Sequence, residues 1–253
     1  MTGKIAVVTG ASSGIGRATS LKFARSGATV VAVGRNKDEL AALGDEVGDE
    51  AGPVIPLLAD VTEVPQIDRA VDEIAERHGR VDVLVNAAGI IGNGSIENTT
   101  LDQWDAMLGI NLRSVFYLMQ KFVPFLQESG GNVVNVSSVT GVRAFPNVLA
   151  YCVSNAGVDQ LTRCAALELA SKGVRVNAVN PGVVVTNLHK RGGMAEEDYE
   201  KFLEHARSTH PLGRPGRPDE IADLIYFLAS DEAGWITGVT YEIDGGRAQT
   251  CAR

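Results

Sequence analysis

The chain has 253 residues, of which 45% are hydrophobic and 21% charged, and its formal net charge is -8. A doubly wound sheet of this length commonly forms one domain, which buries enough apolar surface to fold without a disulfide or a metal. The acidic balance and the lack of a basic stripe argue against a nucleic-acid partner, because binding to phosphates depends on clustered Lys and Arg.

The cysteines and the apolar runs indicate the compartment. Cys152, Cys164 and Cys251 are an odd number without metal-ligand spacing, which favours a reduced intracellular setting over a disulfide framework. Residues 1–10 enter a strand pattern at once and leave no room for a signal peptide. No apolar run approaches the length of about 18 residues that a membrane span needs. We therefore expect a cytoplasmic protein with no membrane partner.

Seven short apolar runs alternate with longer amphipathic segments. In chain order they read IAVVT, ATVVAV, VIPLL, VDVLVN, NVVNVS, VRVNAV and VTYEI, and each predicts a strand. Helical patterns cover residues 14–26, 37–51, 63–78, 101–128, 149–171 and 218–230. This alternation predicts an α/β class protein with a doubly wound Rossmann fold, in which a seven-stranded parallel sheet carries helices on both faces.

No repeat or linker divides the chain, so residues 1–253 are expected to form one domain. The irregular part is residues 183–218, which follow the sixth strand and contain the helical pattern AEEDYEKFLEHA. A connection of this length is usually functional or disordered. We interpret it as a lid over a substrate; a plain surface excursion is the alternative.

The remaining polar clusters have simpler explanations. The four histidines, at positions 78, 189, 205 and 210, neither cluster nor adopt metal-ligand spacing. We therefore expect no metal site and interpret them as surface or lid residues. Glu196, Glu197 and Asp198 are expected to form the acidic first turn of the lid helix, where negative charge complements the helix dipole.

The segment TGASSGIG follows the first strand and opens a helix, which is the position of a phosphate-binding turn. Glycines there allow a tight turn and a close approach of the backbone to a pyrophosphate, whose charge free amides at the helix N-terminus stabilise. A purely structural turn is the alternative. The predicted cofactor residues of this turn are Gly10, Ser12, Ser13, Gly14, Ile15 and Gly16.

The second strand ends in VAVGRN, where an NAD-specific protein often carries an acid that binds the ribose hydroxyls. Gly34 and Arg35 stand there instead, and a guanidinium can pair with a 2′-phosphate. The sequence thus favours NADP(H) over NAD(H), although Ser13 supplies no second cation. An exposed arginine at a strand end is the alternative.

Taken together, the G-x-x-x-G-x-G spacing, the segment NVSSVTG, a tyrosine thirteen residues after Ser138, and NPGVVVT resemble the short-chain dehydrogenase/reductase family along essentially the whole chain. The resemblance implies an oxidoreductase that transfers hydride between a nicotinamide cofactor and a small carbonyl or secondary alcohol. It is about equally close to 3-oxoacyl-carrier-protein reductases and to secondary-alcohol dehydrogenases, so the substrate stays open.

The resemblance also assigns site residues. It implies that Ser138 polarises a carbonyl oxygen, that Tyr151 delivers a proton, and that Asn111 holds a water in a proton relay. It places Asp60 and Val61 at the adenine. Further cofactor residues implied in this way are Asn86, Ala87 and Gly89 on the adenosine side and Pro181, Gly182, Val184 and Thr186 near the carboxamide.

One position departs from the family pattern Tyr-x-x-x-Lys, because YCVSN places Asn155 where lysine is expected. Positions 151 and 155 share one face of a helix. A lysine there would lower the pKa of the phenol, and asparagine can bind the ribose but supplies no charge. Three interpretations stay open: a natural variant with a working relay, an impaired or substituted enzyme, or an NADP-binding or interaction protein without turnover.

The expected assembly is a homotetramer, which the resemblance implies. The helical segments 101–128 and 149–171 are long enough to pair across a two-fold axis as a four-helix interface. The tail after Asp244 offers a second interface.

Overall fold

The apolar runs form one sheet in the computed structural model, which describes residues 1–48 and 51–250. The strands are β1 (Ile5–Thr9), β2 (Thr29–Gly34), β3 (Val54–Leu58), β4 (Val83–Asn86), β5 (Asn132–Val136), β6 (Arg175–Pro181) and β7 (Thr240–Ile243). Their order is β3-β2-β1-β4-β5-β6-β7, and every neighbouring pair is parallel. The predicted doubly wound Rossmann fold is confirmed.

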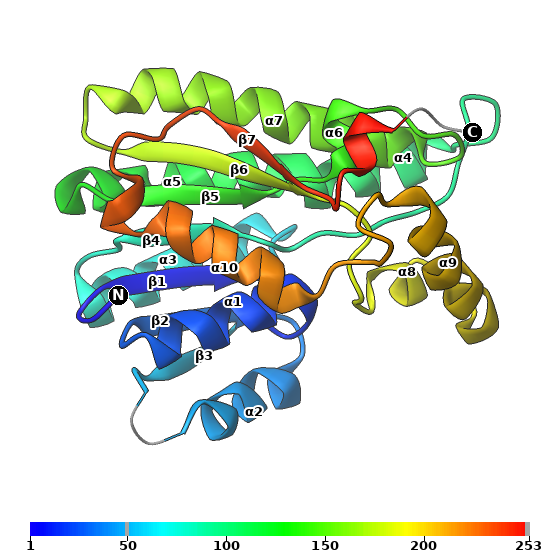
Figure 1. Ribbon diagram of the computed structural model, residues 1–253. Coiled ribbons are helices and arrows are strands. Elements are labelled where there is room, and N and C mark those ends of the chain that lie inside the picture. Colours follow the sequence, from blue (N-terminus) through cyan, green and yellow to red (C-terminus); the bar gives the residue numbers. More distant parts are fainter. Residues whose placement is uncertain (49–50, 251–253) are drawn as a thin grey trace.

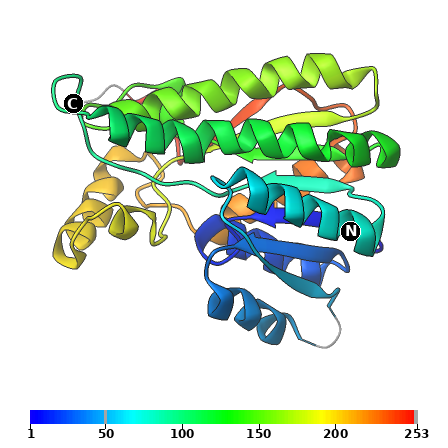
Figure 2. The same ribbon diagram turned by 180° about the vertical axis from the view of Figure 1, so that it is seen from behind.

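Helices cover both faces of the sheet, as Figures 1 and 2 show from opposite sides. The α-helices of the described residues are α1 (Gly14–Arg25), α2 (Lys37–Val47), α3 (Val64–His78), α4 (Leu101–Leu108), α5 (Ser114–Ser129), α6 (Val139–Val142), α7 (Leu149–Ala170), α8 (Leu188–Arg191), α9 (Glu196–Thr209) and α10 (Pro218–Ala229). Helices α1, α2 and α10 pack on one face, and α3, α5 and α7 pack on the other. The three layers explain why the strands read as continuous apolar runs. In β1, Val7 faces one core and Ala6 and Val8 face the other, and all three are fully buried.

The helical pattern 101–128 predicts one helix, but the structure interrupts it with a π-helical turn, η1 (Gly109–Arg113). A capping box at Thr100 starts α4, and Gly130 in the left-handed region ends α5. The wide turn carries Asn111, whose side chain binds the backbone of Ile90 outside the helix. Such turns are frequent at functional sites.

The segment 183–218 holds the predicted helix as α9, preceded by the short α8, and both stand beyond the layers at one edge of the sheet (Figure 1). The acidic first turn of α9 is confirmed. Tyr199 of α9 is buried, and its hydroxyl accepts a hydrogen bond from the N–H of Thr186 and donates one to that residue's carbonyl, at 3.2 and 2.8 Å. These bonds join α9 to the segment that leaves the sheet.

Three expectations need correction or limits. The pattern 37–51 gives a helix that ends at Val47, and residues 49–50 lie outside the described part. His210 lies in the lid segment but is buried rather than exposed, and its ring nitrogens bind the N–H of Val183 and the carbonyl of Ala206 at 3.1 and 2.8 Å. Cys152 and Cys164 are free thiols, and Cys251 lies outside the described residues.

Among the helices of residues 1–48 and 51–250, none combines the length and apolarity that a membrane crossing requires.

Candidate active site

A cavity of about 970 Å³ opens at the carboxyl ends of the strands. The turns after β1 to β6 all contribute to its wall. It lies where the strand order reverses, because the chain passes from β1 to β2 and β3 on one side and then to β4 on the other. Ligands of open α/β sheets bind at such switch points, and the volume suits a dinucleotide with a small substrate.

The predicted site residues come together here. All of them except Gly16 and Asn86 line the cavity. Gly16 lies behind the wall, where an added Cβ would be 2.4 Å from the carbonyl oxygen of Gly10. Asn86 is buried and donates to Asn135 Oδ1 at 2.9 Å, which ties β4 to β5. These two residues shape the cavity from behind.

The turn after β1 forms a cradle that fits a pyrophosphate. Gly10 has a positive φ of 66°, and a Cβ there would be 2.7 Å from the carbonyl oxygen of Ala87, so only glycine fits. Ser13 is the N-cap residue of α1, but its side chain does not cap the helix, and the first turn of α1 holds no acid. Amides at this N-terminus therefore stay available to an anion.

The end of the cavity near β2 carries the predicted cation. Arg35 extends from the end of β2 with a side chain 66% exposed, and its Nη1 lies 3.4 Å from Asp60 Oδ2. Burial alone would raise the pKa of Asp60, but hydrogen bonds from Thr62 and the charge of Arg35 outweigh it and hold that pKa below its usual value. Asp60 is ionised at neutral pH and keeps the guanidinium beside the cavity.

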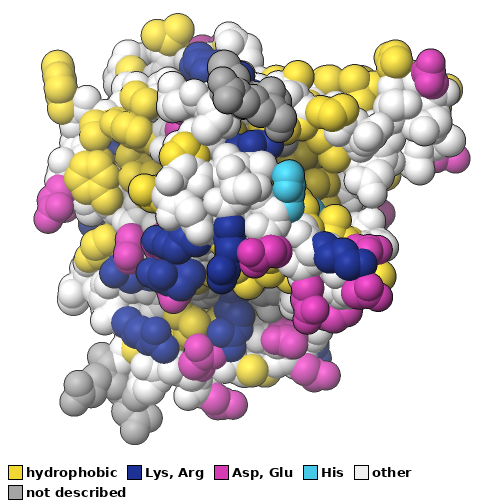
Figure 3. Space-filling view, turned by 45° about the vertical axis from the view of Figure 1, so that its right-hand side comes forward, with side chains coloured by type: hydrophobic (Ala, Val, Ile, Leu, Met, Phe, Trp, Pro, Cys, Tyr) yellow, Lys and Arg dark blue, Asp and Glu magenta, His cyan; other side chains and the backbone are white. Residues whose placement is uncertain are grey.

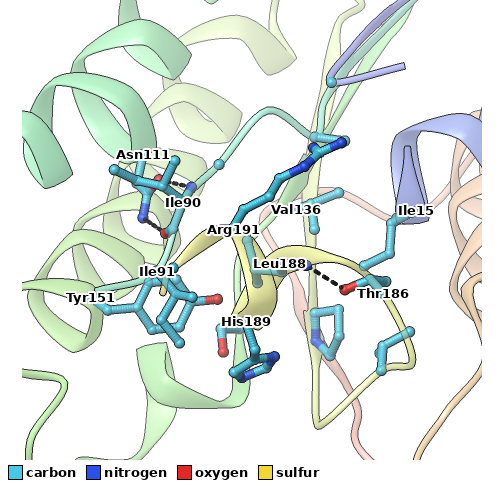
Figure 4. Close-up of a pocket in the computed structure, with 18 of the residues that line it drawn as sticks. Ile15, Ile90, Ile91, Asn111, Val136, Tyr151, Thr186, Leu188, His189 and Arg191 are labelled. Carbon is cyan, nitrogen blue, oxygen red and sulfur yellow. Dashed lines mark hydrogen bonds between the residues drawn. The ribbon is translucent and has the colours of Figure 1, made fainter. Parts of the chain in front are cut away.

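Ser138 and Tyr151 face each other at the other end. Ser138 follows β5 and is buried, and its Oγ accepts a hydrogen bond from the N–H of Thr140 at 3.2 Å. The hydroxyl proton of Ser138 is therefore free to point at a ligand or at Tyr151. Burial raises the pKa of the Tyr151 phenol above its ordinary value of 10.0, and hydrogen bonds to the side chains of Ser138 and Asn155 only partly oppose this. In Figure 4 the Tyr151 ring points into the cavity.

Asn155 occupies the turn of α7 after Tyr151 and is 4% exposed. Its Nδ2 donates to the Tyr151 carbonyl at 2.8 Å and to Thr140 Oγ1 at 3.2 Å. The side chain is thus held in place beside the phenol. Within the described residues, no Lys or Arg contributes to the pKa of Tyr151.

The Asn111 side chain is fully engaged. Its Oδ1 accepts from the N–H of Ile90 at 2.9 Å, and its Nδ2 donates to the Ile90 carbonyl at 2.9 Å and to Ser154 Oγ at 3.2 Å. Figure 4 shows the paired bonds to Ile90. A relay water at Asn111 would therefore have to meet the main-chain carbonyl, because both amide hydrogens are in use.

A buried polar network fixes the backbone of Ser138. The Nδ2 of Asn180 donates to the Ser138 carbonyl at 2.9 Å and to Asp159 Oδ2 at 2.8 Å. Burial raises the pKa of Asp159, against hydrogen bonds from Ser137 and Asn180 that lower it. No sequence motif marks this carboxyl, because its contacts join α7 to β6, which are separate segments of the chain.

Several lining residues carry no motif and were missed. From the lid come Leu188, His189, Arg191, Phe202 and His205; from elsewhere come Lys37, Phe145 and Arg247. They mix apolar and cationic side chains, and Figure 3 shows Lys and Arg side chains gathered across the middle of the face turned forward there. The described residues contain no group of three or more His, Cys, Asp and Glu side chains that could hold a metal.

Comparisons with known proteins agree with this geometry. The family model described as enoyl-(acyl carrier protein) reductase matches residues 10–248. The 3-oxoacyl-(acyl-carrier-protein) reductase FabG of Thermotoga maritima is 43% identical over 97% of this chain and 98% of its own. The cyclohexanol dehydrogenase of Acinetobacter sp. is 36% identical over 96% and 94%.

A solved structure is also close along the full length. A short-chain dehydrogenase/reductase of unknown function from Caenorhabditis elegans, solved with cofactor, has a TM-score of 0.94 and 34% identity, over 99% of this chain and 97% of that one. Sequence, fold and the placing of the site residues agree: the chain belongs to the short-chain dehydrogenase/reductase family of oxidoreductases.

Proposed function

We propose that this protein is an NADP(H)-dependent oxidoreductase that interconverts a carbonyl compound and a secondary alcohol. The observation that carries the proposal is the single cavity that brings the phosphate cradle, Arg35 and the Ser138–Tyr151 pair together. The cradle and the uncapped N-terminus of α1 fit a pyrophosphate, and the exposed guanidinium of Arg35 fits a 2′-phosphate.

The chain's own residues would divide the work along the cavity. The bound nicotinamide supplies or accepts hydride. Ser138 donates a hydrogen bond from its free hydroxyl to the carbonyl oxygen and so orients and polarises it. Tyr151 gives its phenolic proton to that oxygen in reduction and takes it back in oxidation. Asn155 donates one hydrogen bond to the main-chain carbonyl of Tyr151 and one to Thr140, and the apolar lining residues exclude water from the reacting atoms.

The lining supports a small or elongated hydrophobic substrate. Ile91, Phe145, Val148, Leu188 and Phe202 contribute apolar surface to the cavity. The named activities of the two relatives, a 3-oxoacyl reductase and a cyclohexanol dehydrogenase, suggest the first compounds to test.

The test is a screen of 3-oxoacyl thioesters, cyclic ketones and their alcohols with NADPH and NADH. The proposal expects turnover that is faster with NADPH and lost in Tyr151→Phe. If NADPH binds but no pair of compounds turns over, the activity assigned here is wrong.

The neutral residue at position 155 favours a second candidate, an NADP-binding or interaction protein without turnover. Nothing positively charged acts on the Tyr151 phenol within the described residues. This candidate expects NADPH binding with no turnover in the same screen, even at alkaline pH, where a phenol ionises without help.

A further inference from the structure

Arg191 is the last residue of α8, and it lies close to the phosphate cradle although it is far from it in sequence. Its Nη1 donates to Ser13 Oγ at 2.8 Å. In Figure 4 its extended side chain runs from the lid away from Tyr151 and His189. The lid thereby reaches the residue at the N-cap position of α1.

The other cations of residues 183–218 are neutralised by carboxylates. Ion pairs join Lys190 to Glu196, Lys201 to Glu197, Arg207 to Glu204, and both Arg214 and Arg217 to Glu220. Within residues 1–48 and 51–250, no carboxylate lies within 4.0 Å of the Arg191 guanidinium. Its hydrogen-bond partner Ser13 is a neutral hydroxyl.

The position of this charge is unfavourable without an anion. A helix N-terminus carries a partial positive charge, so a cation placed there is repelled. The first turn of α1 contains no acid, and the Ser13 side chain does not cap the free amides. Two positive groups, a guanidinium and a helix end, thus meet at one place, and a bound anion would balance both.

Contacts of the residues next to Arg191 hold this part of the lid against the cradle and the cavity wall. Thr186, at the root of the lid, packs on the cradle, since an added Cβ at Gly14 would be 3.2 Å from its Cγ2. At the end of α8, a Cβ at Gly192 would be 2.7 Å from the Ile91 carbonyl oxygen. The His189 ring packs on Phe202 with centroids 4.4 Å apart, which joins α8 to α9.

We propose that Arg191 is a lid residue that binds the pyrophosphate of the dinucleotide cofactor and couples lid closure to cofactor binding. The pyrophosphate is favoured over the 2′-phosphate because Arg191 lies at the N-cap of α1, whereas Arg35 lies at the end of β2 beside Asp60. When cofactor binds, the pyrophosphate replaces Ser13 as the partner of the guanidinium. This inference rests on the proposed dinucleotide binding.

The test measures affinity rather than turnover, using the full chain and three ligands. NADPH, NADH and ADP-ribose all contain the pyrophosphate, and only NADPH has a 2′-phosphate. Arg191→Gln should weaken all three by a similar factor of about ten to one hundred, the range expected for a charge-assisted contact. Arg191→Lys should recover part of the loss. Arg207→Gln is the matched control, because this arginine lies on the same lid but pairs with Glu204, and it should change affinity by less than about twofold.

The alternatives give different results. A loss confined to NADPH would place Arg191 at the 2′-phosphate and overturn the proposal, and so would unchanged affinities in Arg191→Gln.

Folding and the parent proposal are controlled separately. The melting temperature of each variant without ligand identifies misfolding, and Arg191→Gln should keep it while losing most of the increase that NADPH gives the wild type. Arg191→Lys keeps the test valid if the glutamine variant misfolds. A wild type that binds none of the three ligands would refute the proposed function itself.

Discussion

Replacing Asn155 by lysine would place an ammonium one helical turn from Tyr151. The Cβ atoms of helical residues at this spacing lie about 5.5 Å apart, and we take this as the distance between the two charges. At an effective dielectric constant of about 20, a unit charge at that distance favours the phenolate by about 3 kcal/mol, or about two pKa units. The site is 4% exposed, so desolvation of the lysine offsets part of this gain. The expected net decrease in the phenol pKa is about one to two units.

The decrease should act mainly in one direction of the reaction. Alcohol oxidation needs Tyr151 as a base, and burial raises its pKa above 10.0 in the present chain. Oxidation should therefore accelerate about ten- to one hundredfold at neutral pH in Asn155→Lys, with the rising limb of the pH profile moved to lower pH. Carbonyl reduction uses the neutral phenol and should change by less than about threefold.

The assay is the initial rate of both directions across pH, at cofactor concentrations above the separately measured dissociation constant. Asn155→Met introduces an unbranched side chain close to lysine in length but without charge, and it should not move the rising limb of the pH profile. Tyr151→Phe should abolish activity in both directions. If Asn155→Lys leaves the rate and the pH profile of oxidation unchanged, or lowers activity in a folded protein, then Asn155 belongs to a working relay and the charge-deficit reasoning is wrong.

Three further properties can be measured. Arg35→Asp should weaken NADPH about ten- to one hundredfold relative to NADH; equal affinities in the wild type would contradict the role of Arg35. Sedimentation should give a homotetramer, and Leu167→Asp, at a side chain of α7 that is 83% exposed, should shift it to smaller species; a wild-type monomer at micromolar concentration would refute this. Burial lowers the pKa of His210 below 6.5, so the stability that its neutral ring contributes is present above pH 6.5 and is lost as the pH falls toward the lowered pKa. Melting temperatures should therefore fall more steeply with acid in the wild type than in His210→Gln, and parallel curves would contradict this.

The sheet was predictable because its strands are buried on both faces. Apolar runs such as IAVVT are what a parallel strand between two helical layers requires, and alternation with helices determines the topology. Arg35 was predicted from its place at the end of the second strand, and Ser138 from the resemblance to the family. Both line the cavity because residues directly after parallel strands meet at one edge of the sheet.

What the sequence did not reveal depends on contacts between distant segments. The π-helical turn at Asn111 lies inside an apolar pattern that predicts one α-helix, and the bonds from Asn111 to Ile90, which lies outside the helix, follow from no local pattern. His210 lies in a sequence typical of a loop, yet it is buried because its ring bonds to the segment after β6 and to α9. Arg191 and Ser13 are 178 positions apart, and no local pattern relates them.

The charges of the cavity explain why cofactor binding and proton transfer can respond differently to sequence change. Arg35, Lys37 and Arg191 line the cavity, and Arg35 and Arg191 flank the positions proposed for the adenosine and the pyrophosphate. The Tyr151 phenol, by contrast, has only the neutral side chains of Ser138 and Asn155 to oppose the effect of burial on its pKa. The N-terminus of α7 adds a further favourable potential, because Tyr151 lies in its first turn, but such a helix end contributes about 0.3–1 kcal/mol, less than the lysine would. A chain with these charges should bind its cofactor firmly and depend on alkaline pH for oxidation, so a pH profile measured at saturating cofactor separates the two functions directly.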